Sequence, residues 1–386
     1  MIGGFCAVAP VGMPAGTLPT GRIDYAANYF APLKGILMHG GWGESSKWEP
    51  MSETWKLDAT GWQLLTVQNA PALAHHSMTC DEARQVLVIC GQAVMGQGSH
   101  QVWEFNGTVW TRTAELSGSD WWDAEITYDR DRQRLVLYRA SMSGQEETWE
   151  NAGAAWEKKE YAQKPVVCGD GALFKYDAGL KKVVLVGSPG FEAPSETWLW
   201  DGTNWAKAGG SQPTNASFGG MTYDGARGQM VLLATDMKTY VLDGSGWTPR
   251  SPTHSPTPSP MGFFNLAYDT QRQVSVFFGG EASATGGGAP TYPTATWEWN
   301  GAEWTEFEPG VSPPPLVRLS LSKIGVDQVR LSWPTVASNW VLLAQERLDP
   351  ALDWQPVSAT VVVAGEECST TLGASNPHRF FRLKQP

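Results

Sequence analysis

The side chains of this sequence that could hold a metal ion or transfer protons lack the spacing that such chemistry needs. The histidines are His39, His75, His76, His100, His254 and His378. His75 and His76 are adjacent, and neighbours on a strand point to opposite faces, so we do not expect them to share an ion. No Ser-His-Asp order, phosphate-binding glycine loop or dinucleotide fingerprint occurs. The sequence therefore predicts no catalytic residue, no metal site and no cofactor.

Three glutamates are the remaining candidates for acid–base chemistry. Glu53, Glu147 and Glu196 each stand two residues before a tryptophan, at one position of an internal repeat. A carboxylate held near a sugar could transfer a proton. A residue that recurs by internal symmetry more often makes the same structural hydrogen bond in each copy, and we interpret the three glutamates in this way.

Aromatic side chains outside the repeat are the candidates for binding. Their rings could stack on the faces of sugars or on the side chains of a peptide. We expect the ligand-binding residues to be Trp42, Trp48, His100, Trp121, Trp122 and Tyr292.

Composition excludes several classes of protein. The 386 residues include 42 glycines, 26 prolines and 20 tryptophans, and only 17% are charged. This composition is unlike that of coiled coils, helical arrays or disordered chains. The net charge of −11 repels a phosphate backbone, so we expect no nucleic-acid partner. No apolar run approaches the roughly 18 residues of a membrane span.

Tryptophan spacing reveals an internal repeat. Six aromatic residues are each followed, seven positions later, by a tryptophan: Trp55 and Trp62, Trp103 and Trp110, Trp149 and Trp156, Trp198 and Trp205, Tyr240 and Trp247, Trp297 and Trp304. Most intervals contain Asp-Gly or Asn-Gly, which supply the positive φ angles of tight hairpin turns. Each copy therefore predicts a β-hairpin with an aromatic residue on both strands.

A second hairpin precedes the first in every copy. We call its characteristic residue the marker; the six markers are Tyr29, Cys80, Tyr128, Tyr176, Tyr223 and Tyr268. A polar turn and an apolar strand follow, and the strand ends eleven residues after the marker. Two hairpins make a four-stranded antiparallel sheet that cannot bury its faces alone. We therefore predict an all-β fold, a six-bladed β-propeller over residues 20–310 with four-stranded antiparallel blades.

The pattern of Tyr-Asp, apolar strand, Gly-Gly, Thr-Trp, Asp-Gly and Trp resembles the kelch-type propellers. Only Gly40-Gly41 and Gly279-Gly280 keep the double glycine, and Tyr240 replaces a tryptophan. The sequence does not decide how the ring closes, because a seventh, eroded blade could include residues from the N-terminal segment, 1–19.

A second domain follows a proline-rich hinge over residues 311–316. Residues 317–386 read as short strands that fit a small β-sandwich. The stretch from Val329 to Pro334, with Trp354 and Phe380 to Leu383, resembles the fibronectin type III-like modules that end many secreted bacterial proteins. This resemblance implies an extracytoplasmic or secreted protein, although no secretory leader is visible in the sequence.

The five cysteines predict no metal site and no disulfide. None of them forms a Cys-x-x-Cys pair. Cys80 and Cys90 flank one predicted hairpin but are out of register for a bridge. We expect buried free thiols.

Loop lengths indicate which face of the propeller binds. The spacings within both hairpins are constant, whereas the connection from the end of the second strand to the next anchor spans 15, 12, 10, 11, 6 and 18 residues. Variable loops on a rigid scaffold commonly carry binding sites, and the candidate aromatic residues fall in them.

A propeller followed by a sandwich also resembles the copper radical oxidases of the galactose oxidase type. That resemblance implies two histidines, two tyrosines and a cysteine linked to one tyrosine, and here no histidine follows a tyrosine. We expect a non-catalytic binding or scaffold protein whose partner is a protein or a surface glycan. The alternative is a sugar-modifying enzyme, epimerase-like or oxidase-like, with its site at the propeller axis.

Overall fold

The structure is a computed structural model, and it describes most of the chain: residues 18–43, 49–92, 99–118, 121–141, 145–151, 155–167, 171–190, 193–256, 260–282, 291–311, 319–325, 327–338, 340–346, 354–365, 367–373 and 379–384. It divides into two compact units, Met1–Pro313 and Pro314–Pro386. Within the described residues the helical elements are two short 3-10 turns, so the all-β prediction is confirmed. No helix in these residues has the length and hydropathy of a membrane span.

The first unit is built from meanders of four antiparallel strands in chain order. Four meanders form separate sheets: β2 (Ala26–Phe30), β3 (Gly35–His39), β5 (Thr54–Asp58) and β6 (Gly61–Leu64); β15 (Leu173–Asp177), β16 (Lys182–Gly187), β17 (Glu196–Trp200) and β18 (Trp205–Lys207); β19 (Gly220–Asp224), β20 (Gln229–Leu233), β21 (Thr239–Asp243) and β22 (Gly246–Arg250); β24 (Leu266–Asp269), β25 (Val274–Phe278), β27 (Thr296–Trp299) and β28 (Trp304–Glu306).

Two further meanders share one eight-stranded sheet. Their strands are β7 (Ala74–Asp81), β8 (Val86–Gln92), β9 (His100–Phe105) and β10 (Trp110–Leu116), then β11 (Trp121–Asp129), β12 (Arg134–Ser141), β13 (Glu146–Asn151) and β14 (Trp156–Lys159). The meanders meet where His76 of β7 pairs in parallel with Ala124 of β11.

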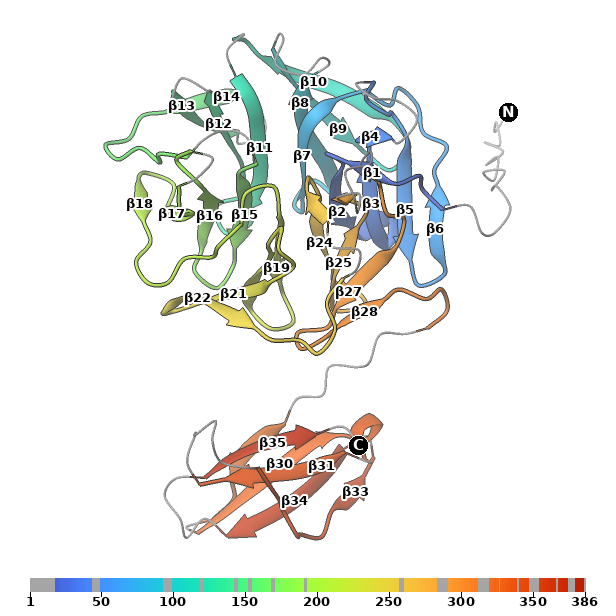
Figure 1. The fold of residues 1–386 in the computed structure, drawn as a ribbon, viewed down its shortest axis with the longest axis vertical. Helices are drawn as coiled ribbons and strands as arrows, with labels where there is room; N and C mark the ends of the chain where they lie inside the picture. Colours follow the sequence, from blue (N-terminus) through green and yellow to red (C-terminus); the bar gives the residue numbers. More distant parts are fainter. Residues whose placement is uncertain are drawn as a thin grey trace, which may run out of the picture. The chain divides into compact units, whose positions relative to one another are not determined.

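The first strands of the meanders form a closed ring around a common axis. Going round, β2 contacts β7, then β11, β15, β19 and β24 follow, and β24 contacts β2 again. Figure 1 looks down this axis, with these strands innermost. This is the radial packing of a β-propeller, and the ring closes without residues 1–17, which lie outside the described part.

Hydrogen bonds between neighbouring meanders explain the tryptophan repeat. The indole N–H of a fourth-strand tryptophan donates to the threonine hydroxyl of the preceding meander's third strand at 2.8–3.3 Å: Trp62 to Thr296, Trp110 to Thr54, Trp205 to Thr148, Trp247 to Thr197 and Trp304 to Thr239. The bond from Trp62 to Thr296 joins the first meander to the last. At the remaining junction the corresponding residues are Trp156 and Val102, which belong to one hydrophobic cluster, and valine offers no side-chain acceptor.

The apolar core lies between adjacent meanders. All eleven repeat tryptophans belong to its hydrophobic clusters or pack against them. Trp200 and Trp299, which lie within strands, are fully buried. The expected free thiols are found at Cys80, Cys90 and Cys368, whereas Cys6 and Cys168 lie outside the described residues.

The turn of each first hairpin has the same backbone conformation. The residue five positions after the marker has a positive φ of 52–66° in every copy: Lys34, Gln85, Gln133, Lys181, Gly228 and Gln273. In five copies an aspartate follows the marker and accepts backbone N–H groups of the turn; Asp269, for example, accepts from Gln271 and Arg272 at 2.9 Å. The constant hairpin spacing therefore reflects one turn geometry.

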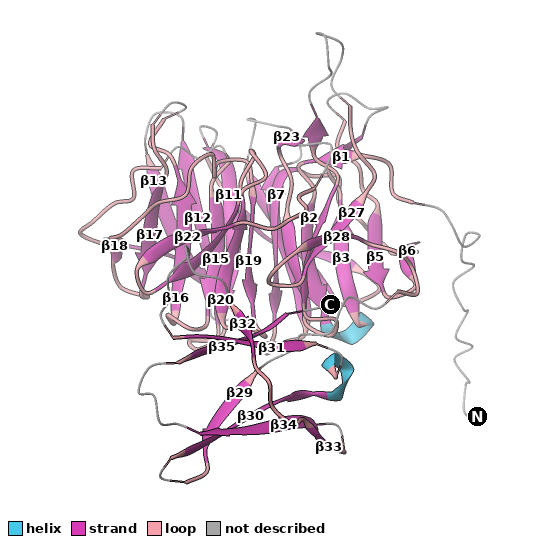
Figure 2. Ribbon diagram, turned by 60° about the horizontal axis from the view of Figure 1, so that its bottom comes forward, coloured by secondary structure: helices cyan, strands magenta, loops and turns pink. Residues whose placement is uncertain are grey.

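The strands define two faces. Because strand direction alternates, both hairpin turns lie at one end of each meander, which we call the turn face. The connections between second and third strands, and between meanders, lie at the other end, the loop face. Two small sheets extend the loop face: β1 (Arg22–Ile23) with β4 (Trp42–Gly43), and β23 (Pro260–Gly262) with β26 (Glu281–Ala282). Figure 2 shows β1 and β23 beyond the ends of the meander strands.

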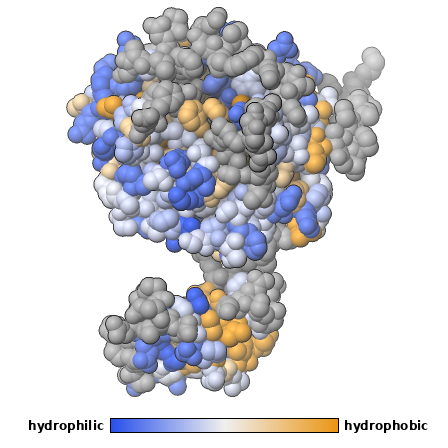
Figure 3. Space-filling view, viewed as in Figure 1, coloured by the Kyte–Doolittle hydropathy of each residue, from blue (hydrophilic) through white to orange (hydrophobic). Residues whose placement is uncertain are grey.

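The second unit consists of two antiparallel sheets. One contains β29 (Ser320–Lys323), β30 (Gln328–Pro334), β34 (Glu367–Gly373) and β33 (Val362–Ala364); the other contains β32 (Gln355–Pro356), β31 (Val341–Gln345) and β35 (Phe380–Lys384). The 3-10 turns are η1 (Ala31–Leu33) in the first unit and η2 (Thr335–Ala337) here. Leu331, Trp333 and Cys368 form the small core of this unit. Figure 3 shows apolar surface gathered on it, and Val361, Val362 and Val363 are among its exposed side chains.

Candidate functional site

A ring of unusual backbone conformations surrounds the axis at the loop face. The residue five positions before the marker introduces each first strand, and in five of the six meanders it has a positive φ of 43–76°: Asp24, His75, Gly171, Phe218 and Phe263. Glycine adopts this conformation freely, whereas residues with a side chain occupy it at a cost in free energy.

Backbone hydrogen bonds connect these entry residues from one meander to the next. Phe218 donates its N–H to the carbonyl of Gly171 at 3.0 Å, and Phe263 donates to Phe218 at 2.8 Å. Asp24 donates to Phe263 at 3.0 Å across the closure of the ring. The bonds hold the left-handed conformation, and the side chains of the ring are left to vary.

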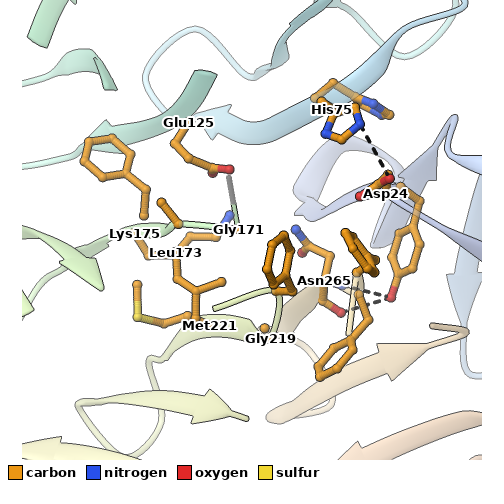
Figure 4. A pocket seen from close by; sticks show the side chains of 17 residues that line it. Asp24, His75, Glu125, Gly171, Leu173, Lys175, Gly219, Met221 and Asn265 are labelled. Atoms are coloured by element: carbon orange, nitrogen blue, oxygen red, sulfur yellow. Dashed lines mark hydrogen bonds and ion pairs between the residues drawn. The ribbon is translucent and has the colours of Figure 1, made fainter. Parts of the chain in front are cut away.

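The entry residues surround a half-open cavity of about 90 Å³, which we call the loop-face cavity. All six meanders contribute to its lining. Figure 4 shows Asp24 and His75 on one side and Glu125 and Lys175 on the other, with Asn265 on a neighbouring strand entry. These five side chains are half-buried, so they are held in place and yet reachable.

Two sets of ionisable side chains line this cavity, Asp24 with His75 and Glu125 with Lys175. Nε2 of His75 lies 4.0 Å from Oδ2 of Asp24. Lys175 extends across the axis, where its Nζ donates to the carbonyl of Met78 at 3.3 Å. Burial lowers the pKa of Lys175, and the nearby Glu125 carboxylate counteracts part of this effect.

Two buried acceptor atoms of the lining have no hydrogen-bond partner among the described residues: Nδ1 of His76 and Oδ1 of Asn265. Burial lowers the pKa of His76 to about 4, so its ring is neutral at pH 7. Its Nε2 lies 2.9 Å from the carbonyl of His39 and must donate there, which leaves Nδ1 as an acceptor. Groups that donate hydrogen bonds would therefore be favoured in this cavity.

Two phenylalanines supply an apolar wall. The rings of Phe218 and Phe263 lie 4.7 Å apart between centroids at an interplanar angle of 45°, and both are half-buried. Gly171 has no side chain because a Cβ there would lie 2.6 Å from the Phe218 ring. The cavity thus combines aromatic faces with polar groups.

The expected ligand-binding residues fall in three groups. Trp42 in β4 is only 9% exposed, and His100 at the start of β9 is fully buried. Neither ring is open to a ligand in this structure. Tyr292 is half-buried, and its backbone packs against Gly21 so closely that a Cβ there would lie 1.9 Å from its carbonyl oxygen.

The other three expected residues cannot be placed as side chains. Trp48 lies outside the described residues. Trp121 and Trp122 begin β11, on the loop face as expected, and their side chains lie outside the described part of the structure.

His75 and His76 were expected to point to opposite sides of a strand, and both residues line the loop-face cavity. The pairing of β7 with β8 shifts between Ala74 and Ser77, and His75 has a φ of 43°. This bulge interrupts the alternation of side chains. Within the described residues, no group of three or more His, Cys, Asp or Glu side chains is arranged to hold a metal ion.

The three repeated glutamates make the structural hydrogen bond that their recurrence indicates. The indole N–H of Trp55, Trp149 and Trp198 donates to the glutamate two residues earlier at 2.9–3.1 Å. The sequence interpretation of these residues is therefore confirmed.

Sequence reasoning missed Asp24, Glu125, Lys175, Phe218 and Phe263. A signal was available, because Asp24, Phe218 and Phe263 all lie five residues before a marker. The sequence did not show that this position faces the axis. Lys175 is a charged residue within a mostly apolar strand. From the pattern of polar and apolar residues alone, it would be placed at the edge of the sheet.

No protein-family model and no curated protein matches this sequence. Among solved structures, the chain is similar to the SapL1 lectin in complex with alpha methyl fucoside, with a TM-score of 0.50 and 13% identity over 77% of this chain and 97% of that chain. The fucose-specific lectin from Aleuria aurantia gives a TM-score of 0.48 and 12% identity over 75% and 96% of the two chains.

A fungal alcohol oxidase of the AA5 family, in complex with copper, gives a TM-score of 0.48 and 10% identity over 97% of this chain and 96% of that chain. At such identities a likeness shows the fold and not the activity. The similarity to the SapL1 lectin, together with the closed ring of meanders, identifies the first unit as a β-propeller.

Proposed function

We propose that this protein is a non-catalytic carbohydrate-binding propeller that holds a sugar in the loop-face cavity. The observation that carries the proposal is the pair of buried acceptors, His76 Nδ1 and Asn265 Oδ1, which have no partner among the described residues. Sugar hydroxyls are donors of the kind that these atoms lack, and an unsatisfied buried acceptor costs about 1–3 kcal/mol.

The rest of the cavity fits the same ligand class. The Phe218 and Phe263 rings offer an apolar surface to the C–H face of a pyranose. The carboxylates of Asp24 and Glu125 accept hydrogen bonds from hydroxyls, and Lys175 donates them. The similar SapL1 structure contains alpha methyl fucoside, which makes this glycoside the first probe to try.

The proposal includes a finer architecture and location. We assign the propeller to the kelch type with six blades, the second unit to the fibronectin type III-like modules, and the protein to an extracytoplasmic location. Trp48, Trp121, Trp122 and Tyr292 remain candidates for the rim of the site, where a longer glycan or a protein surface would extend from the axis.

The second candidate function is a sugar-modifying enzyme at the same cavity. It is favoured by the meeting of an aspartate–histidine pair, Asp24 and His75, with Glu125 and Lys175. Such groups could move a proton at a sugar hydroxyl or hemiacetal. Binding is the better proposal because burial keeps His76 neutral, and both it and Asn265 serve as acceptors in the hydrogen-bonding pattern that holds a hydroxyl.

The test uses the full chain and a panel of methyl glycosides of fucose, galactose, glucose and N-acetylglucosamine. Saturation-transfer NMR identifies a bound sugar, and calorimetry gives its affinity. We expect binding that Phe263→Ala weakens by tenfold or more, about 1.4 kcal/mol, while Asp201→Asn, in an exposed hairpin turn, leaves it unchanged. Binding that Phe263→Ala does not affect would overturn the assignment to this cavity.

The same samples separate binding from catalysis. Free reducing sugars are followed by proton NMR with and without protein. An interconversion of anomers or epimers that is faster than the buffer rate, and that Asp24→Asn abolishes, would favour the enzyme instead.

A further inference from the structure

The axis has a second opening that the proposed function does not use. A cavity of about 650 Å³, the turn-face cavity, is lined by the ends of the first strands and the turns that follow them. Lys175 lines both this cavity and the loop-face cavity and crosses the axis to Met78 between them. The sequence predicted only short turns at this face, and a volume in the range of small-molecule sites was not expected.

Five markers are tyrosines, and their side chains line the turn-face cavity: Tyr29, Tyr128, Tyr176, Tyr223 and Tyr268. They also close the joints between meanders. The hydroxyl of Tyr268 accepts the N–H of Ala226, in the turn of the preceding meander, at 3.0 Å. The hydroxyl of Tyr223 lies 3.5 Å from the Cβ position of Gly179, again in the preceding turn.

The sixth marker is Cys80, which has no ring to reach the preceding turn. That turn is η1, and its first residue, Ala31, is exposed and lines the cavity. The residue at which a marker tyrosine would find its N–H donor is Pro32, which has none. We call the part of the turn-face cavity that Cys80 and Ala31 line, between Tyr29 and Tyr128, the notch.

We propose that this notch and the turn-face cavity form a second carbohydrate site, for a neutral sugar of one or two rings. The proposal rests on the proposed function for its ligand class. The flanking tyrosine rings and the Ala31 methyl group offer an apolar wall the size of one ring. Thr79, Thr127, Thr222 and Asn28 provide hydroxyl and amide groups deeper in the cavity.

The charges at the rim favour a neutral ligand. Arg130 and Glu82 both line the cavity, and Nη2 of Arg130 lies 2.6 Å from Oε1 of Glu82. The two charges compensate each other, so neither attracts an anionic sugar strongly. The long side chain of Lys175 closes the inner end.

The decisive variant restores the missing ring. Cys80→Phe places a phenyl group where five copies of the repeat already hold a tyrosine, so the fold accommodates it, and Cys80→Ser keeps the notch empty. Ala31→Phe fills the notch from the exposed side and provides a second route should Cys80→Phe fold poorly. Maltose and the methyl glycosides are titrated by calorimetry into each full-length variant.

We expect two sites for each chain in the wild type and in Cys80→Ser, and one site in Cys80→Phe and Ala31→Phe. Asp24→Asn should weaken binding at the loop-face cavity about tenfold and leave the site that Cys80→Phe removes unchanged. Unchanged stoichiometry in both ring-filling variants would overturn the second site and leave the loop-face proposal intact. Loss of all binding in Cys80→Phe, with none lost in Asp24→Asn, would overturn the loop-face proposal instead. If no sugar of the panel binds, both proposals fail.

Discussion

The two ends of the first strands share a backbone frame and differ in their side chains. At the turn face the marker is a tyrosine in five meanders, and the position five residues later has a positive φ in all six. At the loop face the entry position has a positive φ in five meanders, yet it carries aspartate, histidine, glycine and two phenylalanines. A repeat position at which both the side chain and the backbone conformation are kept therefore serves to hold the fold together. A repeat position at which only the backbone conformation is kept can carry different side chains, and these can recognise a specific ligand.

The largest effect should come from a repeated position. Trp205 is 1% exposed, donates to Thr148 at 2.9 Å and packs on Trp200 with centroids 5.5 Å apart. Trp205→Ala should lower the free energy of unfolding by about 3–5 kcal/mol, as for other buried aromatic residues. Urea denaturation measures the loss.

Trp156→Ala is the matched control. Trp156 occupies the same repeat position, but it is half-buried, and the residue that corresponds to Thr148 at its junction is Val102, which has no hydroxyl group. Trp156→Ala should lower the free energy of unfolding by clearly less than Trp205→Ala does. Equal costs at the two positions would show that the threonine bond and the deeper burial do not matter.

The second effect depends on pH and on the junction between the first two meanders. Burial lowers the pKa of His39 to about 3 and that of His76 to about 4, and the neighbouring His76 ring lowers the pKa of His39 further. Both pKa values lie below the unfolded value of about 6.5, so below this pH the unfolded chain binds more protons than the native one. Stability should be complete above pH 6.5 and fall by about 2–3 kcal/mol for each ring on going to pH 4.5.

His76→Gln tests this assignment. The variant keeps an amide donor for the His39 carbonyl and removes one titrating ring, so its stability should depend less steeply on pH between 6.5 and 4.5. A slope equal to that of the wild type would assign the pH dependence to other groups, such as His75, which lies beside His76.

The smallest effect concerns the hydrogen bond between a tryptophan and a threonine of neighbouring meanders, which is present at the junction of Trp205 and missing at that of Trp156. Thr148→Val removes the acceptor of Trp205 and should cost about 1 kcal/mol, the usual net value of a hydrogen bond. Val102→Thr offers Trp156 the acceptor that it lacks. It should raise the free energy of unfolding by part of the amount that Thr148→Val loses. Thermal unfolding of both variants measures the changes. A destabilised Val102→Thr would show that the indole of Trp156 does not reach position 102.

Local spacing made the fold predictable from the sequence. The Asp-Gly and Asn-Gly turns, the Tyr-Asp markers and the tryptophans lie within one meander, so each copy indicates its own four strands. Ring closure was not predictable, because the bond from Trp62 to Thr296 joins residues 234 positions apart.

The candidate site was harder to predict, because it depends on tertiary structure. His75 and His76 share a cavity only through a bulge in β7, which the alternating pattern does not reveal. Trp42 was expected to be exposed, but its pairing with Ile23 in a small sheet buries it. Lys175 becomes an axial residue only once six strands have closed around it.

The most direct test of the account is the affinity of the bound methyl glycoside for Asp24→Asn, measured beside the melting temperature. Asparagine tolerates the φ of 52° at this position, so the backbone ring should survive the substitution. Binding at the loop-face cavity should be about tenfold weaker, with an unchanged melting temperature. Unchanged binding together with a lowered melting temperature would show that the entry residues of the loop face hold the fold together and do not bind the sugar.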